Sequence, residues 1–463
     1  MRTKRSRLLT GVSVLASAAL LLTACGGDGG GGGGSGVVDE NADKGLPVVG
    51  ENVTYDPNTL VNEGQPVALE WWAWDFVEKW QEIADAYEEI HPNVTITVVN
   101  QPWDDYWTKL PLELQGSGGP TMFNVHNSHH ENLINYMDPY DIPVEELDAD
   151  FVGAASHVID GEVHYVDFGL MSGAIYYNTD MWEAAGLTDA DIPETWEQFR
   201  EVAQKLTIRE GDRFTQAGFN MNGASHHLQL GMPYQLGQNL FEADQATPAV
   251  DTQAGLDTMN TLLEIYADGS GDPNFGPDFL ESFGQGQSAM VYAWGHFAGT
   301  LNRDYPGLNW STFRTPVPVA GETPYAFDRY NGEATFGINT AASDAQKEAA
   351  QDFLRYFLTD AESQKALALN YGVYPAYRLI ADDPAFADAP AQSAFGDIER
   401  YIWPGPMPAT FENSLDRAWQ DVLYNGVDPA AALASAQSSI EQDLEGRGFV
   451  AVENLYSFFD ESN

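Results

Sequence analysis

The stretch Val67-Ala-Leu-Glu-Trp-Trp-Ala-Trp-Asp75 decides the fold, because it joins a strand to an aromatic plane and a carboxylate at its end. Its apolar and aromatic side chains favour a β-strand. Residues 76–90 then repeat apolar positions with the period of a helix. Ligands of an α/β sheet collect at the carboxyl ends of its strands. We therefore expect Trp74 and Asp75 to face a ligand, whereas Trp72 fits either a core or a ligand-facing position.

The chain continues this alternation of strand and helix. Residues 94–99 alternate and are β-branched, 103–114 have a helical period, and 122–125 form a short apolar run. This rhythm predicts parallel strands joined by right-handed crossovers. Thr195 and Gln198 fit the start of a helix, in which each side chain bonds the other's backbone N–H. Further strands are expected at 170–178, in a segment that runs through Trp294, and at 335–339. Further helices are expected at 252–266, 345–357, 361–370, 414–423 and 429–444.

Length and charge limit the classes of function. A chain of 463 residues suits two lobes, and its apolar fraction of 43% excludes disorder for the whole chain. The formal net charge is −48, with no basic run beyond residue 7. Its field repels nucleic acid, anionic lipid surfaces and polyanions, so a neutral ligand is expected. The acidity also suggests a saline habitat, a hypothesis that thermal melts without stabilisation by salt would contradict.

The first 65 residues predict export and anchoring. Residues 1–24 combine a basic start, a short apolar run and small residues before Cys25, as in a secretory signal peptide. Leu22-Thr-Ala-Cys25 resembles the lipobox of bacterial lipoproteins, which implies cleavage before Cys25 and its diacylation. About 15 apolar or small residues fall short of the roughly 20 that a membrane span needs. Residues 25–65, rich in glycine at first, are expected to form a tether, and the folded domain is expected to begin near Pro66.

Metal and cysteine chemistry are not expected. Cys25 is the only cysteine, so the mature domain has no free thiol for catalysis or thiolate ligation. A zinc site would draw on His126, His129, His130, His226 and His227, but only His126 and His130 have the i, i+4 spacing of a helix-borne ligand pair, and they are expected on a loop. Residues 268–274 place oxygens at alternate positions like a calcium loop but lack its turn glycine and terminal glutamate. We expect no metal and no cofactor.

A series of short motifs, in fixed order, resembles the extracellular solute-binding proteins of ATP-driven importers, in the sugar-binding group that includes maltodextrin-binding protein. The motifs are Pro92-Asn-Val-Thr-Ile-Thr-Val98, Tyr106-Trp-Thr-Lys-Leu110, Gly116-Ser-Gly-Gly-Pro120, Ile175-Tyr-Tyr-Asn-Thr-Asp180, Pro193-Glu-Thr-Trp-Glu-Gln-Phe199, Phe283-Gly-Gln-Gly-Gln-Ser-Ala-Met290, Phe353-Leu-Arg-Tyr-Phe-Leu358 and Tyr371-Gly-Val-Tyr-Pro375. The resemblance as a whole extends over about residues 67–445. The chain departs from the family in having Thr121 where an Asp is frequent, and a strand end rich in His and Asn where a charged pair is frequent.

The resemblance implies an α/β, two-lobed periplasmic-binding-protein-like fold. Each lobe is expected to be a mainly parallel sheet flanked by helices, with the ligand cleft between the lobes. The expected boundaries are 66–173 plus about 335–372 for lobe 1, and about 174–334 plus 373–463 for lobe 2. The crossings between lobes are expected near 171–176, 331–335 and 371–377. The implied function is a lipid-anchored, monomeric protein that binds a neutral sugar or oligosaccharide and delivers it to the permease subunits of an ABC importer.

A sugar site combines aromatic planes for the apolar sugar faces with polar groups for the hydroxyls. The expected ligand-binding residues are Trp74, Asp75, Asn127, His129, Trp294, Arg329, Glu333, Tyr371 and Tyr374. Further candidates are Trp72, Trp103, Asp104, Tyr234, Gln235, His296 and Glu412. The resemblance places a stacking aromatic at Trp294 and ligand contacts at Asn127 and His129. Arg329 and Glu333 flank the second crossing and could clamp neighbouring hydroxyls.

Two other functions compete with a transport role. A lipid-anchored glycoside hydrolase needs two carboxylates about 5–10 Å apart, and a chain with 69 acidic residues always contains such pairs. A surface lectin would hold polysaccharide without a transporter. The chain carries no serine elbow, phosphate loop or zinc-helix motif, so no enzyme activity is expected.

Overall fold

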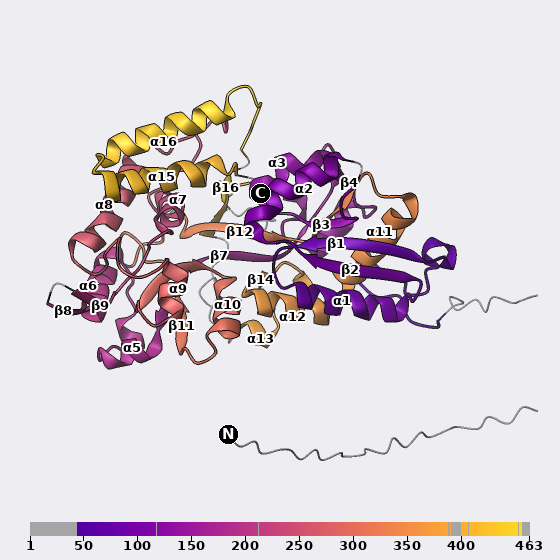
Figure 1. Ribbon diagram of the computed structural model, residues 1–463, viewed down its shortest axis with the longest axis horizontal. Coiled ribbons are helices and arrows are strands. Elements are labelled where there is room, and N and C mark those ends of the chain that lie inside the picture. The colour runs from indigo at the N-terminus through magenta and orange to yellow at the C-terminus, as the bar shows by residue number, and fades with distance from the viewer. Residues whose placement is uncertain are drawn as a thin grey trace, which may run out of the picture. The chain divides into compact units, whose positions relative to one another are not determined.

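The computed structural model describes residues 44–116, 118–211, 213–387, 389, 400–405, 407–451 and 453–455. The expected signal peptide, Cys25 and the glycine-rich run lie outside these residues. Two separate sheets organise the described part of the chain (Figure 1). None of its helices is both long and apolar enough to cross a membrane.

The first sheet has the strand order β2-β1-β3-β13-β4. β1 (Val67–Ala73) pairs in parallel with β2 (Val94–Asn100) and β3 (Met122–Asn124). β13 (Phe336–Asn339) runs antiparallel to β3 and to β4 (Met137–Asp138). The helices of this lobe include α1 (Val77–Ile90), α2 (Trp103–Gln115), α3 (His130–Leu133), α4 (Val144–Asp150), α11 (Asp344–Thr359), α12 (Ala361–Tyr371) and α13 (Pro384–Ala387).

Trp71 lies at the centre of the first core. It is fully buried, and its Nε1 donates to Asn124 Oδ1 at 2.7 Å. Its ring lies 4.9 Å from that of Trp80 and 5.0 Å from that of Phe336. The indole thus ties β1 to α1, β3 and β13, and Trp71 is a core residue.

The second sheet is built on β7 (Asp167–Asn178), which pairs antiparallel with every strand that neighbours it. Its partners are β10 (Met290–Trp294), β11 (Trp310–Phe313), β12 (Asp328–Ala334) and β14 (Tyr374–Pro375). β15 (Tyr401–Trp403) extends the sheet from β12 in parallel, and β16 (Asn454–Leu455) pairs antiparallel with β15. The expectation of a mainly parallel sheet in this lobe is wrong, because β7 and β12 carry the chain between the lobes in opposite directions.

Helices surround the second sheet: α5 (Thr179–Ala184), α6 (Trp196–Leu206), α7 (Ser225–Gln235), α8 (Gln253–Ala267), α9 (Phe279–Gly284), α10 (Phe297–Asp304), α15 (Thr410–Asn425) and α16 (Pro429–Leu444). Two-stranded hairpins pair β5 (Val158–Ile159) with β6 (Glu162–Val163), and β8 (Ile208–Glu210) with β9 (Arg213–Gln216). The predicted start of α6 is confirmed: Thr195 Oγ1 accepts from the Gln198 N–H, and Gln198 Oε1 accepts from the Thr195 N–H.

The strand β7 links the two main apolar cores. Phe168, Leu170 and Met171 belong to the core of the first lobe, whereas Ile175 and Tyr177 belong to that of the second. β12 lies beside β7 over the same region, as Figure 1 shows. The expected crossings at 171–176 and 331–335 therefore lie on neighbouring strands.

The fold begins earlier than the sequence predicts. Val53, Tyr55 and Val61 are at most 2% exposed and pack in the first core. Asp150 holds this segment, because its Oδ2 accepts from the Val53 N–H at 2.7 Å and its Oδ1 from Asn52 Nδ2 at 2.7 Å. The described residues from 44 to 65 are thus part of the domain, which corrects the expected start near Pro66. Their apolar residues are too sparse to show a period.

The expected boundary between residues 372 and 373 is also wrong. Val373, Ala376 and Ile380 pack in the first core, and β14 pairs with Gly169 and Leu170 of β7. Gly169 permits this contact, since a Cβ there would lie 2.3 Å from a methyl group of Val373. The segment after α12 therefore stays with the first lobe, and β15 returns the chain to the second.

Truncation tests the revised start of the domain. A chain beginning at residue 66 is expected to unfold at a lower temperature than one beginning at residue 44. The shorter chain loses three buried side chains, each worth about 1.5–3 kcal/mol of burial, and leaves the Asp150 carboxylate without its donors. Thermal unfolding of both chains measures the difference. Equal midpoints would show that residues 44–65 add nothing to the domain.

Candidate functional site

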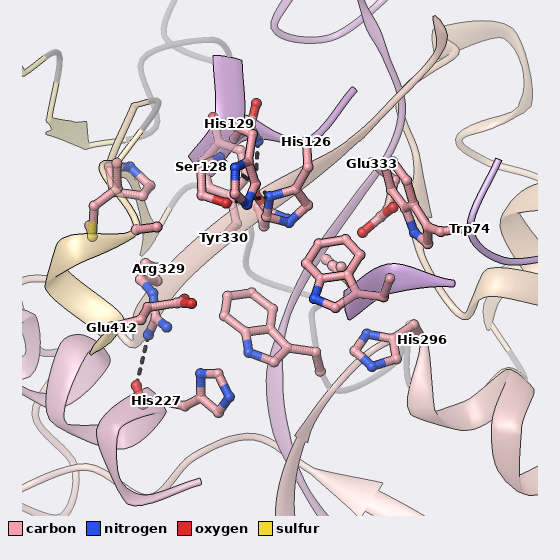
Figure 2. A pocket seen from close by; sticks show the side chains of 18 of the residues that line it. Trp74, His126, Ser128, His129, His227, His296, Arg329, Tyr330, Glu333 and Glu412 are labelled. Carbon is pink, nitrogen blue, oxygen red and sulfur yellow. Dashed lines mark hydrogen bonds between the residues drawn. The ribbon is translucent and has the colours of Figure 1, made fainter. Parts of the chain in front are cut away.

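A cavity of about 720 Å³ lies between residues of the two lobes. This central cavity is lined by the ends of β1, β3 and β10, the start of α2, the strand β12, the end of α12 and the loop before α15. Most of the predicted ligand-binding residues line it: Trp74, Asp75, Asn127, His129, Trp294, Arg329, Glu333 and Tyr371, together with Trp103, His296 and Glu412. Figure 2 shows Arg329, Glu412 and His227 on the left of the view and Trp74, Glu333 and His296 on the right.

Aromatic rings from the first lobe form one wall. Trp74 follows β1 directly, and its ring lies 5.2 Å from that of Trp103 and 5.3 Å from that of Trp107. Trp103 is 42% exposed, so its indole remains accessible. Because β1 and β3 are parallel neighbours, their carboxyl ends bring Trp74 beside His126, with 6.4 Å between the rings. The wall offers flat apolar surface to a ligand.

The histidines of the loop after β3 are neutral hydrogen-bonding groups. Burial lowers the pKa of His126 to about 3, helped by His129 and His296, and burial lowers that of His129 to about 4. His126 Nδ1 lies 2.8 Å from Ser128 Oγ, and the ring of His129 stacks on Trp107 at 3.9 Å. Both imidazoles are therefore held in place and uncharged at neutral pH.

Asn127 joins the crossing strand β12 to the first lobe. Its Nδ2 donates to Asn331 Oδ1 at 2.7 Å and to the Gly332 carbonyl at 3.3 Å, and its Oδ1 accepts from Tyr165 at 3.2 Å. The Asn127 amide lines the cavity, but its hydrogen bonds are made with other groups of the protein. Its role in this conformation is to position β12.

The strand β12 presents charged and polar groups to the cavity at alternate positions. Arg329, Asn331 and Glu333 share one face of the strand, as the two-residue period requires. The Arg329 side chain is 3% exposed, and its Nη1 donates to the His227 carbonyl of α7 at 2.8 Å. Its Nη2 is buried without an acceptor among the described residues. The guanidinium also lies 4.9 Å from the ring of Trp294, which packs against it.

Glu333 is a buried acid, only 8% exposed. Burial raises the pKa of its carboxyl to about 8, and the nearby carboxylates of Asp167 and Asp75 raise it further in the same direction. The group is therefore mostly protonated at pH 7. It can donate one hydrogen bond and accept others.

Trp294 and Tyr371 approach the cavity from the ends of β10 and α12. The Tyr371 ring lies 4.1 Å from that of Phe76, and its hydroxyl accepts from Trp80 Nε1 at 3.2 Å. Gly295 and the chain near Tyr371 approach so closely that a Cβ on Gly295 would lie 2.4 Å from the Gly372 carbonyl oxygen. The backbone segments next to Trp294 and Tyr371 are therefore in direct contact.

Several expected site residues lie elsewhere. Trp72 is buried, with its Nε1 bonded to Glu70, and Tyr374 is half-buried on β14; neither lines the cavity. Tyr234 donates to Glu453, and Gln235 donates to the carbonyls of Pro316 and Phe327. These four expectations are corrected, because the polar groups of Tyr234, Gln235 and Trp72 bond within the protein. Asp104 belongs to α2, and its side chain lies outside the described residues.

Other cavity residues were not predicted from the sequence. They are His126, Ser128, Met171, His227, Phe279, Leu280, Tyr330, Asn331, Pro404, Gly405, Met407, Pro408, Ala409 and Asn413. The alternation of β12 could have indicated Asn331 once Arg329 and Glu333 were candidates. The loop before α15 carries no pattern that sets it apart. Within the described residues, no group of three or more His, Cys, Asp or Glu side chains is placed to hold a metal ion.

Residues 82–394 match the model of the bacterial extracellular solute-binding proteins. The chain belongs to this family. Its members bind solutes for transport and are not enzymes. A relative from Sinorhizobium fredii, named a probable amino-acid ABC transporter periplasmic-binding protein, is 24% identical over 76% of this chain and 82% of its own length. The maltotriose-binding protein of Pyrococcus abyssi is 20% identical over 80% of each chain.

Solved structures show the fold of this family member. The maltose/maltodextrin-binding domain of Bdellovibrio bacteriovorus bound to maltotriose matches with a TM-score of 0.67 at 20% identity, over 82% of this chain and 100% of that chain. A chitin oligosaccharide binding protein matches with a TM-score of 0.66 at 19% identity, over 82% of this chain and 99% of that chain. The predicted two-lobed fold is confirmed.

Glu333→Gln is expected to stabilise the protein at pH 8 and not at pH 4. The folded pKa is raised to about 8 from an ordinary value of 4.5. The protonated carboxyl therefore contributes fully below pH 4.5, and this contribution is lost as the pH rises towards 8. Glutamine does not ionise, so the variant gains roughly 1–3 kcal/mol at pH 8. Urea unfolding from pH 4 to 8 measures this difference. A difference that stays constant over this range would contradict the buried, protonated state.

Proposed function

We propose that this solute-binding protein takes up a sugar, in particular an oligosaccharide, and delivers it to an ABC import permease. The observation that carries the proposal is the pairing of indole rings from both lobes across one cavity. Trp74 and Trp103 approach from the first lobe, and Trp294 from the second. Each ring contact with an apolar sugar face adds about 0.5–1.5 kcal/mol beyond its area. The volume of about 720 Å³ lies within the usual range for ligand sites.

The polar groups of the cavity suit hydroxyls. His126 and His129 are neutral, Glu333 is mostly protonated at pH 7, and Arg329 has a buried N–H without a partner in the described part of the chain. A site with unfilled hydrogen-bonding capacity favours ligands that fill it, because each buried polar group left unpaired costs about 1–3 kcal/mol. A sugar supplies both donors and acceptors.

Binding in the proposed mechanism favours a closed arrangement of the lobes. A ligand that touches both walls stabilises the state in which both are near it. Arg447, after α16, already forms an ion pair with Glu131 of α3 on the first lobe. This exposed pair is worth little on its own, so the ligand has to supply most of the closing energy.

The proposal includes a location at the outer face of the cell membrane. Cleavage before Cys25 and diacylation of its thiol would attach the protein by lipid alone, and the glycine-rich residues that follow would act as a spacer. The monomer suffices, because the cavity draws its walls from one chain. A Cys25→Ser protein found in the medium instead of the membrane fraction supports the anchor; membrane retention of that variant contradicts it.

An amino acid is the second candidate ligand, given the name of the Sinorhizobium relative. Arg329 could take its carboxylate and Glu333 its ammonium group. The two residues are four positions apart on β12, about 13 Å at roughly 3.3 Å per residue. The ammonium and carboxylate of an α-amino acid are attached to one carbon, so pairing with both residues would require both side chains to bend towards the middle of this row. This separation favours the longer oligosaccharide.

Calorimetry with mono- to tetrasaccharides and free amino acids tests the proposed function. Binding of one or more saccharides, without any change in their chain length, is expected. Release of shorter sugars would instead establish a hydrolase, and binding of polysaccharide alone would establish a lectin. Binding of amino acids with no saccharide binding would overturn the sugar assignment.

Trp294→Ala is expected to weaken binding of the preferred saccharide by at least about 1 kcal/mol, because it removes the aromatic plane of the second lobe. Trp310→Ala on β11 is the matched control, since Trp310 does not line the central cavity. Its affinity is expected to match that of the parent protein. Unchanged affinity in Trp294→Ala would remove this ring from the site, and equal losses in both variants would indicate a general loss of structure.

A further inference from the structure

Glu333 is a buried acid of the central cavity whose carboxyl has no partner among the described residues. The residue is 92% buried, lines the cavity, and receives no hydrogen bond or ion pair at its carboxyl group from the described residues. Neighbouring polar groups differ in this respect. Asn127 is engaged in three hydrogen bonds, and Arg329 donates to the His227 carbonyl.

The surroundings of Glu333 contain two further carboxyl groups, each of which already has a partner other than Glu333. Asp75 lines the same cavity, and Asp167 lies close enough to interact electrostatically. Asp167 already bonds the His157 imidazole at 2.9 Å. Arg303 forms an ion pair of 3.8 Å with Asp75, but its side chain is half exposed and also forms two 3.0 Å bonds with Asp304.

The remaining groups at this end of the cavity are uncharged. Burial lowers the pKa of His296, and Asp75 opposes this shift only in part. Burial, Glu333 and Asp75 raise the pKa of Tyr371 well above its ordinary range, so its hydroxyl is neutral. Among the residues that the structure describes, no lysine lines the cavity, and the Arg329 Cα lies about 13 Å away along β12. This end therefore attracts positive charge, as does the whole chain with its net charge of −48.

We propose that the cavity selects an oligosaccharide that carries a basic amine, and that the ammonium group sits against Glu333 and Asp75. This inference rests on the proposed function and names the substrate class of the same site. A carboxylate is costly to bury without a partner, and an ammonium group that enters with the ligand stabilises this form, so that Glu333 gives up its proton to solvent on binding. An ammonium group also donates hydrogen bonds to both acids, which a single hydroxyl does not.

Arg329 defines the other end of the ligand. Its unpartnered Nη2 donates to an oxygen, and its guanidinium packs against Trp294. Because the Cα atoms of Arg329 and Glu333 lie about 13 Å apart and Figure 2 shows the two side chains on opposite sides of the cavity, the amine and this oxygen belong to different sugar units in the proposal. The ligand thus has at least two units, and its aminated unit lies towards the Trp74 side of the cavity, where Asp75 follows β1.

The test compares saccharides that differ only at the amine. Calorimetry is performed at pH 7 with the β-1,4-linked glucosamine disaccharide, its N-acetylated form and cellobiose, and with glucosamine, N-acetylglucosamine and glucose. The aminated member is expected to bind at least tenfold more tightly than its neutral partners. Glu333→Gln keeps the size of the side chain but cannot become a carboxylate beside an ammonium group, and it is expected to abolish this preference. Glu210→Gln, an exposed position on β8, makes the same substitution away from the cavity and is expected to preserve it.

The outcomes separate this inference from the proposed function. Equal or tighter binding of the neutral partners, or binding confined to neutral saccharides in the wider panel, overturns the amine selection and leaves the sugar function in place. An amine preference that persists in Glu333→Gln overturns the assignment to this residue, provided that the variant keeps the cooperative unfolding of the parent protein. If no saccharide of any kind binds, the proposed function itself fails.

Discussion

The antiparallel pairing of β7 with β12 is the constraint on which the site depends. It joins the segments that pass between the lobes, with Asn331 opposite Met171 and Glu333 opposite Gly169. β12 packs so closely against the Asp167 side chain of β7 that a Cβ on Gly332 would lie 1.8 Å from an Asp167 oxygen. This pairing fixes which face of β12 points into the central cavity, and so delivers a guanidinium, an amide and a carboxyl in one row.

Around this row, contacts within the protein hold the binding groups in place, and several of these groups are uncharged. Stacking on Trp107 holds His129, and a hydrogen bond to a backbone carbonyl holds Arg329. Preorganised groups lose little freedom when a ligand arrives, so more of each contact appears as affinity. The exception is the Glu333 end, where buried acid is left without a partner. The site is therefore asymmetric, with the Arg329 guanidinium at one end and the Glu333 and Asp75 carboxyl groups at the other.

Site residues at strand ends could be predicted from the sequence. Polar residues that bond within the protein could not be distinguished from site residues in this way. Trp74, Asp75 and Trp294 could be predicted because each ends a strand or directly follows one, where α/β sheets place their ligands. Tyr234 and Gln235 resemble site residues in type, but their partners come from segments distant in sequence, such as Glu453. No local pattern reveals such partners. The same applies to the antiparallel second sheet, because strand direction depends on how the chain passes between lobes.

Hydrogen exchange with and without a saturating saccharide tests the central claim most directly, namely that one ligand is held by both lobes. Binding is predicted to protect backbone amides on both sides of the cavity together: residues 126–130 after β3 in the first lobe, and residues 294–297 and 407–413 in the second. Protection is expected to reach both sides at the same ligand concentration. Protection confined to one lobe would contradict a site shared between them.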